Sequence, residues 1–364
     1  MIFKRTLKLV VLFTVFIILS ISCSQDKNQI PDLNTSEVPK LELDHQFTIS
    51  DTEEIILQQI TGVKSDSEGR IFLPDQRALQ IHVFDSQGDY STSIGREGSG
   101  PGEFLSLLKI YIDQKNQIIA FDVRQARNII FAESNNSWEP KNMFMIEGQR
   151  FSIESADSLG NVVLRQSPPQ RPEPGAYWYK HELATGNFTS GLTEEDVLTF
   201  RDRGNLVSDN GAMQQIPFGR TTVVATDPMG NIYLVWNEKF ELAAYDATME
   251  LIDSLSVPIP NQPISSEERN EAIDRLGDNF RSLGREHMPE TKPVISNMFV
   301  DGNRNIWLQT FDSPEYLVLD NEGTPIGSFD LEDELRLVHV DKNRLYALKM
   351  GAEGYQIHVF DYMF

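Results

Sequence analysis

The six histidines of the chain are the residues best suited by type to metal binding or proton transfer, but their spacing favours neither. Imidazoles with either role must converge with other ligating or acid–base groups. The sequence has no His-x-Glu or His-Glu-x-x-His spacing and no Gly-x-Ser-x-Gly nucleophile motif. We therefore predict no catalytic histidine set and no cofactor. The histidines are His45, His82, His181, His287, His339 and His358.

A second group of residues suits binding better than catalysis. Arginine, aromatic and amide side chains recur in or beside short polar segments that follow β-rich runs. Such side chains anchor sugars, peptides and protein surfaces. The alternative is structural, with Arg77 and Arg127 bracing neighbouring elements through Asp75 and Asp122. The binding candidates are Arg77, Arg124, Arg127, Arg165, Trp236, Asn237 and Tyr316.

These candidates are placed by a repeat that occurs six times. In each copy a short apolar run is followed by Asp, a turn and a second apolar or aromatic run. The turn is a hairpin signal, because the Asp side chain can accept main-chain hydrogen bonds and the Gly or Asn beyond it tolerates positive φ. Three intervals between copies are 40 to 47 residues and two are 70 and 74. The copies are centred on Asp66, Asp113, Asp157, Asp227, Asp301 and Asp341.

Further strand-like runs follow most copies, which gives four strands for each repeat. Four-stranded meanders at this period are the signature of a β-propeller. The predicted fold is all-β, a six-bladed β-propeller of four-stranded antiparallel blades over residues 41–364. Because the last copy ends at its third strand, we expect residues 41–50 to supply its outer strand and remove an exposed edge.

The two long intervals contain insertions, at residues 166–215 and 265–293. In the second, Ser265 and Glu268 have the spacing of a capping box. Ile273, Leu276 and Phe280 then follow at helical spacing. This predicts one inserted helical segment, a helix of about four turns on the flank of the propeller.

The innermost strand of each repeat has one apolar register and one register of mixed polarity. Mixed polarity beside the axis predicts a solvated central channel. His82 and His358 share one repeat position, so His339 is the only histidine expected to face the channel. A structural calcium ion there would be compatible with binding and with catalysis. The channel candidates are Lys64, Tyr111 and His339.

The stretch GREGSGPGEF, residues 95–104, contains four glycines and a proline. A phosphate-binding loop would continue with Lys and Ser or Thr and then a helix, but a strand-like run follows here. The stretch is therefore a joint between two repeats. Together with IHVFD, at residues 81–85 and 357–361, it resembles the pattern of NHL-repeat propellers.

This resemblance implies two possible functions. Some propellers of this kind are lyases or lactonases that hold a metal on the axis. The alternative function is therefore an axial-site lyase or hydrolase, with or without a metal. One axial histidine does not supply such a metal site. The sequence therefore favours a monomeric binding or scaffold module for a protein, peptide or glycan partner.

Residues 1–22 predict a secretory signal peptide, in which three basic residues precede the apolar run Leu9–Ile21, too short to span a membrane. Cys23, the only cysteine, follows directly. With Ser22 before it, it resembles a bacterial lipobox, which implies a lipidated N-terminus; an ordinary signal peptide is the alternative. Residues 23–40 would comprise the lipidated Cys and a flexible tether.

The net charge of −22 opposes binding to nucleic acid and to an anionic leaflet, so attachment should depend on the lipid. Ser24, rather than Asp, follows the cysteine, which resembles the sequence of lipoproteins sorted to the outer membrane. The sequence thus predicts a lipid-anchored cell-envelope protein, at the outer membrane.

Overall fold

The computed structural model describes residues 38–135, 137–145, 152–167, 170–187, 191–311, 315–352 and 354–364. The predicted signal peptide, Cys23 and most of the tether lie outside these residues. Among the described residues, no helix is long and apolar enough to cross a membrane.

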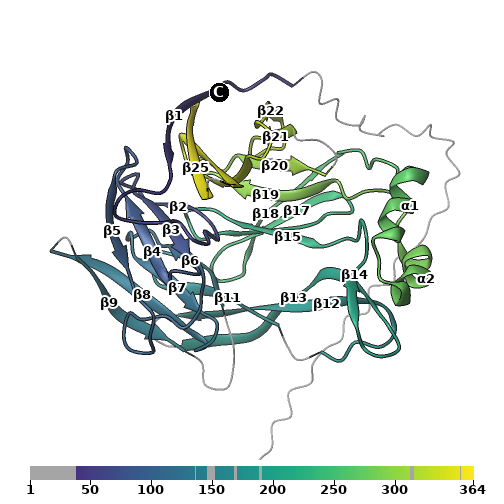
Figure 1. Cartoon of the computed structure of the whole chain (residues 1–364), viewed down its shortest axis with the longest axis horizontal. Helices are drawn as coiled ribbons and strands as arrows, with labels where there is room; N and C mark the ends of the chain where they lie inside the picture. Colours follow the sequence, from purple (N-terminus) through teal and green to yellow (C-terminus); the bar gives the residue numbers. More distant parts are fainter. Residues whose placement is uncertain are drawn as a thin grey trace, which may run out of the picture. The chain divides into compact units, whose positions relative to one another are not determined.

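The described chain forms six antiparallel sheets, called blades 1 to 6, that follow one another in chain order (Figure 1). Strands that are consecutive in the chain pair antiparallel within each blade. Blade 1 comprises β2 (Lys64–Ser65), β3 (Ile71–Asp75), β4 (Gln80–Phe84) and β5 (Tyr90–Ile94). Blade 2 comprises β6 (Leu107–Ile112), β7 (Ile118–Asp122), β8 (Arg127–Ser134) and β9 (Ser137–Phe144). Blade 3 comprises β10 (Ser152–Ala156), β11 (Asn161–Gln166), β12 (Gly175–Asn187), β13 (Gly191–Val207) and β14 (Met213–Gln215).

Blades 4 and 5 each have four strands, and blade 6 is completed from the other end of the chain. Blade 4 comprises β15 (Thr222–Thr226), β16 (Ile232–Trp236), β17 (Phe240–Tyr245) and β18 (Leu251–Val257). Blade 5 comprises β19 (Ile295–Val300), β20 (Ile306–Thr310), β21 (Glu315–Leu319) and β22 (Pro325–Asp330). Blade 6 comprises β23 (Arg336–Val340), β24 (Arg344–Gly351), β25 (Gly354–Tyr362) and β1 (Leu43–Ile49). The predicted all-β fold is confirmed.

The pairing of β1 with β25 joins the two ends of the described chain. Leu43 lies opposite Tyr362 and Ile49 opposite Ile357, and Figure 1 shows purple β1 beside yellow β25. The expectation that residues 41–50 supply the outer strand of the last repeat is confirmed. Without β1, the main chain of β25 would be an unpaired edge.

An apolar core lies between every pair of successive blades, including blades 6 and 1. The core between blades 6 and 1 contains Ile49, Val63 and Tyr346, and the one between blades 5 and 6 contains Trp307 and Leu345. The other four interfaces have cores of the same kind. Blades 1 to 6 therefore form a closed ring, and strands such as β3 and β7 are buried on both faces.

The repeated Asp residues act as the sequence predicts. Each accepts main-chain N–H groups from its own turn, as Asp227 does from Met229 and Asn231. In the sixth copy, Asp341 accepts from Asn343 and Arg344, in agreement with its shorter turn. These local bonds fix the hairpin between the first two strands of each blade.

The two insertions differ from the prediction in detail. Residues 166–215 extend blade 3 through the long β12–β13 hairpin, and β14 makes this blade five-stranded rather than four-stranded. The second insertion contains two helices, α1 (Ser266–Asp274) and α2 (Asp278–His287), instead of one. The Ser265–Glu268 capping box is present, and α1 ends at Asp274 with Arg275 as its C-cap. Gly277, which is unfavourable within a helix, is the extended N-cap of α2.

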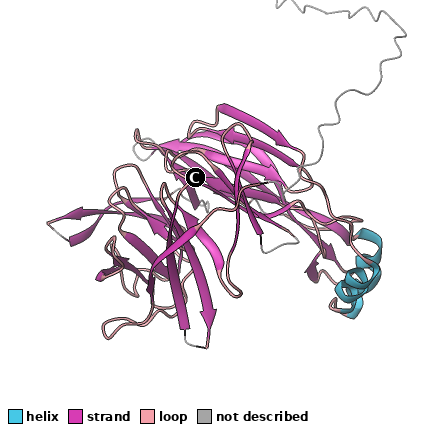
Figure 2. Ribbon diagram, turned by 90° about the horizontal axis from the view of Figure 1, so that it is seen from above, coloured by secondary structure: helices cyan, strands magenta, loops and turns pink. Residues whose placement is uncertain are grey.

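The helices lie together at one end of the molecule (Figure 2). Ile273, Leu276 and Phe280 form an apolar cluster with Leu206 of β13 and Ile216. The predicted apolar positions therefore do face the sheet, and the helices cover the outer end of the extended blade 3.

Candidate axial ligand-binding site

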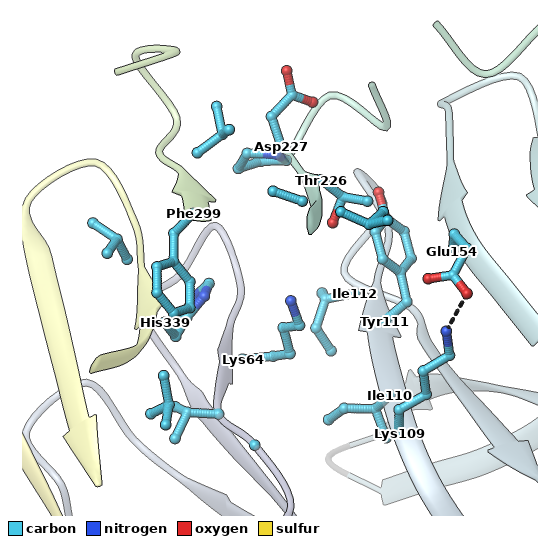
Figure 3. Close-up of a pocket in the computed structure, with 18 of the residues that line it drawn as sticks. Lys64, Lys109, Ile110, Tyr111, Ile112, Glu154, Thr226, Asp227, Phe299 and His339 are labelled. Carbon is cyan, nitrogen blue, oxygen red and sulfur yellow. Dashed lines mark hydrogen bonds and ion pairs between the residues drawn. The ribbon is translucent and has the colours of Figure 1, made fainter. Parts of the chain in front are cut away.

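The inner strands of all six blades line one cavity of about 380 Å³. Its lining strands are β2, β6, β10, β15, β19 and β23, so the cavity lies where the innermost strands meet. Figure 3 shows side chains from several of them pointing toward a shared space. The predicted channel is therefore present. Its apolar lining includes Ile110, Ile112, Val224, Met298, Phe299 and Val338.

An ion pair between blades 2 and 3 occupies one side of this cavity. The Lys109 ammonium lies 2.7 Å from Glu154 Oε1, and the Ser152 hydroxyl donates to the same oxygen over 3.0 Å. Burial acts to raise the pKa of Glu154, but the charges of Lys109 and Arg165 hold it below its usual value. Glu154 is therefore ionised and already paired.

Lys64, from β2, extends its amine toward the middle of the cavity (Figure 3). Within the described part of the chain, no carboxylate oxygen lies within ion-pair distance of this amine. Burial lowers the pKa of Lys64, the positive charge of Lys109 lowers it further, and Glu154 offsets only part of the effect. Lys64 is thus an amine without a carboxylate partner, in surroundings that disfavour its charged form.

Arg165 also reaches the cavity, from β11. Its guanidinium lies over the Phe200 ring, 5.2 Å from the centroid, and 4.0 Å from Asp202 Oδ2. The exposed fraction of its side chain is 25%. Arg165 therefore adds positive charge to the wall while keeping a carboxylate neighbour.

His339 lines the cavity but acts as a brace between blades 6 and 1. The Ser65 N–H donates to its Nε2 over 3.2 Å, and the imidazole stacks on Tyr346. An N–H can only donate, so Nε2 is the unprotonated nitrogen. Burial, together with the charge of Lys64, lowers the pKa of His339 to about 3. His339 is neutral at physiological pH, and its Nε2 is occupied.

Tyr111 donates its phenolic hydrogen to the main-chain oxygen of Ala156 over 3.1 Å. Burial raises the pKa of this phenol. Its ring therefore forms part of the wall between blades 2 and 3, and its hydroxyl is already used.

Comparison with known proteins agrees with this geometry. Residues 26–132 match a family model described as a 6-bladed beta-propeller. The chain is a six-bladed β-propeller. A search among curated proteins finds no significant match.

Two solved structures share the propeller fold over most of both chains. A protein described as exported, from Bacteroides fragilis, is 13% identical with a TM-score of 0.52, over 90% of this chain and 96% of that one. A member of the DUF4221 family from Bacteroides vulgatus is 10% identical with a TM-score of 0.52, over 90% and 99%. At such low identity these similarities concern the fold.

Three predicted binding residues are structural parts of the propeller. Arg127 is 5% exposed and donates to the main-chain oxygens of Ser99, Gly100 and Glu103. Asn237 is buried and bonds to Thr221 and Ile295. Tyr316 is 2% exposed; its hydroxyl accepts the Leu337 N–H, and its ring stacks on Phe329. These side chains are not available to a partner at the surface, which corrects the prediction.

The other predicted rim residues remain accessible. Arg77 and Arg124 are exposed, and Trp236 is half-buried, with its indole N–H donating to Glu238 over 3.2 Å. Asp75, in contrast, accepts four main-chain N–H groups, from Gln58, Gln59, Arg77 and Ala78. The structural alternative therefore holds for Asp75, through main-chain bonds rather than an arginine pair.

The described residues that line the cavity do not form a cluster of metal ligands. Within the described ranges, no three His, Cys, Asp or Glu side chains gather around one point. Asp227, at the cavity wall, accepts from Asn231, Tyr233 and two main-chain N–H groups. Both lining carboxylates, Glu154 and Asp227, are thus engaged by protein donors.

The sequence analysis did not predict Glu154 as a residue of the cavity, nor its ion pair with Lys109. Lys109 belongs to the mixed register of its strand, so its inward position could be expected. Glu154 gives no distinctive sequence signal, because acidic residues are common throughout this chain. Pairing it with Lys109 requires knowing that β6 and β10 are neighbours.

Proposed function

We propose that this propeller is a lipid-anchored ligand-binding protein of the cell envelope and that its ligand is a small molecule, or one residue of a glycan or peptide, held in the axial cavity. The cavity volume falls within the range of about 300–1,000 Å³ typical of such sites. The wall combines apolar side chains with polar and charged groups that could orient a ligand. The observation that carries the proposal is the unneutralised amine of Lys64 inside the cavity.

A cavity-blocking variant tests this site. Val338 lines the cavity and Ile252 is exposed on β18, so Val338→Trp fills the site and Ile252→Trp is the matched control. The probes are monosaccharides and N-acetyl amino acids that bind the wild type in ligand-detected NMR. We expect Val338→Trp to weaken their binding at least about tenfold, and Ile252→Trp to leave it unchanged. Equal binding by both variants would place the site elsewhere.

The membrane anchor is a separate part of the proposal. Its support is the sequence: a short apolar run, then Cys23, then a polar tether. The described chain begins at Val38, and Lys40 is held by Glu315 and Asp330 at blade 5, so the tether would end on the propeller surface. In fractionated cells, Cys23→Ala should leave the membrane fraction, whereas Ser22→Ala, which keeps a small residue there, should not. A Cys23→Ala protein that stays in the membrane would contradict the anchor.

One observation favours a hydrolase as a second candidate, outside the cavity. The Ser167 hydroxyl lies 2.7 Å from His181 Nδ1, and His181 Nε2 lies 2.9 Å from Asp202. The His181 hydrogen bond helps to hold the pKa of Asp202 below its usual range against burial, so Nε2 carries the proton and Nδ1 can accept from Ser167. Labelling of Ser167 by a fluorophosphonate, lost with His181→Gln, would support this function; an unlabelled serine would dismiss it.

A further inference from the structure

We infer that the group bound at the centre of the axial cavity is a carboxylate that pairs with Lys64. This inference rests on the proposed axial site and specifies the chemistry of its ligand. The positive charge is local, since the chain as a whole carries a net charge of −22.

The first step is the distribution of charge in the cavity. Two cations, Lys109 and Arg165, lie near Glu154, and both lower its pKa. The Lys109 ammonium is in direct contact with Glu154, and Arg165 has Asp202 as a further neighbour. The single negative charge of Glu154 is thus already paired with Lys109. Lys64 is therefore left as the amine whose charged form a bound anion would stabilise.

The second step is the cost of leaving Lys64 as it is. An unpaired ammonium in a partly enclosed cavity loses hydration that protein groups do not replace. His339 cannot compensate, because its Nε2 is occupied by the Ser65 N–H. An anion placed beside Lys64 recovers this cost, so the site gains affinity from charge pairing that a neutral molecule would not provide.

The third step concerns the kind of anion. One lysine, protonated beside its ligand, matches the single charge of a carboxylate, whereas phosphate sites generally combine several cations or a cluster of main-chain N–H groups. Phe299 and Ile112 line the same cavity as Lys64 (Figure 3). This wall favours a carboxylate attached to a compact apolar or sugar-like body.

The acidity of the rest of the chain adds selectivity. The overall negative charge disfavours large polyanions at the surface. A small monoanion can enter the cavity, where the low-dielectric walls strengthen its interaction with Lys64. The arrangement therefore selects small carboxylates over nucleic acids or polyphosphates.

The experiment compares matched carboxylate and amide probes on the full chain in detergent. Benzoate is paired with benzamide, phenylacetate with phenylacetamide and N-acetylglycine with its amide, and inorganic phosphate is added as a separate probe. Affinities are measured by ligand-detected NMR for the wild type, Lys64→Met, Lys64→Arg and the exposed-lysine control Lys115→Met. Thermal unfolding of each variant verifies folding.

We expect at least one carboxylate to bind about tenfold or more tightly than its amide, the difference typical of one charge-assisted hydrogen bond. Lys64→Met should abolish this preference, while Lys64→Arg and Lys115→Met should keep it. Equal binding of acid and amide, binding unchanged in Lys64→Met, preference for inorganic phosphate, or no carboxylate binding at millimolar concentration would each overturn the inference.

The failure of this inference is distinguishable from failure of the proposed function. If amides bind as well as acids and Val338→Trp abolishes both, the axial site stands and the carboxylate assignment is wrong. If Val338→Trp has no effect on any probe that binds, the axial site itself is wrong.

Discussion

The guanidinium of Arg127 donates to the main-chain oxygens of Gly100, over 3.1 Å, and Glu103, over 2.7 Å. A third bond reaches Ser99. Arg127 opens β8 in blade 2, whereas its acceptors belong to the glycine-rich joint between blades 1 and 2. One buried cation therefore holds a segment that has few side chains to fix its own shape.

Replacing Arg127 with Met should lower the free energy of unfolding by about 2–4 kcal/mol, because partly buried main-chain oxygens would lose charged donors. Arg124→Met is the matched control: this arginine is three residues away and exposed, so its loss should change stability by no more than about 0.5 kcal/mol. Urea unfolding gives both values. Equal losses would contradict the role assigned to Arg127.

The same joint predicts a steric effect at Gly95. Its φ is +85°, and a Cβ at this position would overlap the Phe104 ring. Gly175 also has a positive φ, of +119°, but a Cβ there would have no atom within 4 Å. Gly175→Ala should therefore cost only backbone strain, about 1–2 kcal/mol, and Gly95→Ala clearly more. Thermal and urea unfolding would measure the difference. A smaller loss of stability for Gly95→Ala than for Gly175→Ala would show that the Phe104 ring moves aside at little cost.

The fold could be predicted because its signals are local and repeated. An Asp that accepts N–H groups two and four residues later forms its turn without distant partners, so Asp66 and Asp227 are recognisable in isolation. Closure by β1 followed from counting strands, since one blade lacked an outer strand. The break between α1 and α2 was missed because the apolar spacing continues through Gly277.

The site could be predicted only in part, since side-chain partners depend on which blades are adjacent. Lys64 and Tyr111 were placed at the channel by strand register. Arg127 and Arg124 lie in the same short segment, yet one is buried and the other exposed. Tyr316 is the second residue of the third strand of blade 5. Its burial follows from packing against blade 6, which the sequence of blade 5 does not reveal.

Closure of the ring predicts that β1 contributes strongly to stability. Ile49 is 2% exposed and lies in the core between blades 6 and 1, so Ile49→Ala should cost about 2–4 kcal/mol. Gln46→Ala, on an exposed position of the same strand, should be nearly neutral. Deletion of residues 41–50 should also expose β25 and promote aggregation, measured by light scattering. A deletion variant with unchanged melting temperature and solubility would contradict closure by β1.

The brace at His339 predicts a loss of stability in acid. The pKa of His339 is 6.5 in the unfolded chain and about 3 in the folded chain, where burial disfavours the imidazolium. Between these values the unfolded chain binds the extra proton, so stability falls as the pH decreases from 6.5 toward 3 and is fully retained above 6.5. The slope from this one group is at most about 1.4 kcal/mol per pH unit. His339→Gln keeps an acceptor for the Ser65 N–H but does not titrate, so its stability should depend less on pH in this window. Urea unfolding of both proteins at pH 7, 6 and 5 measures the difference, and parallel pH profiles would show that His339 titrates normally in the folded chain.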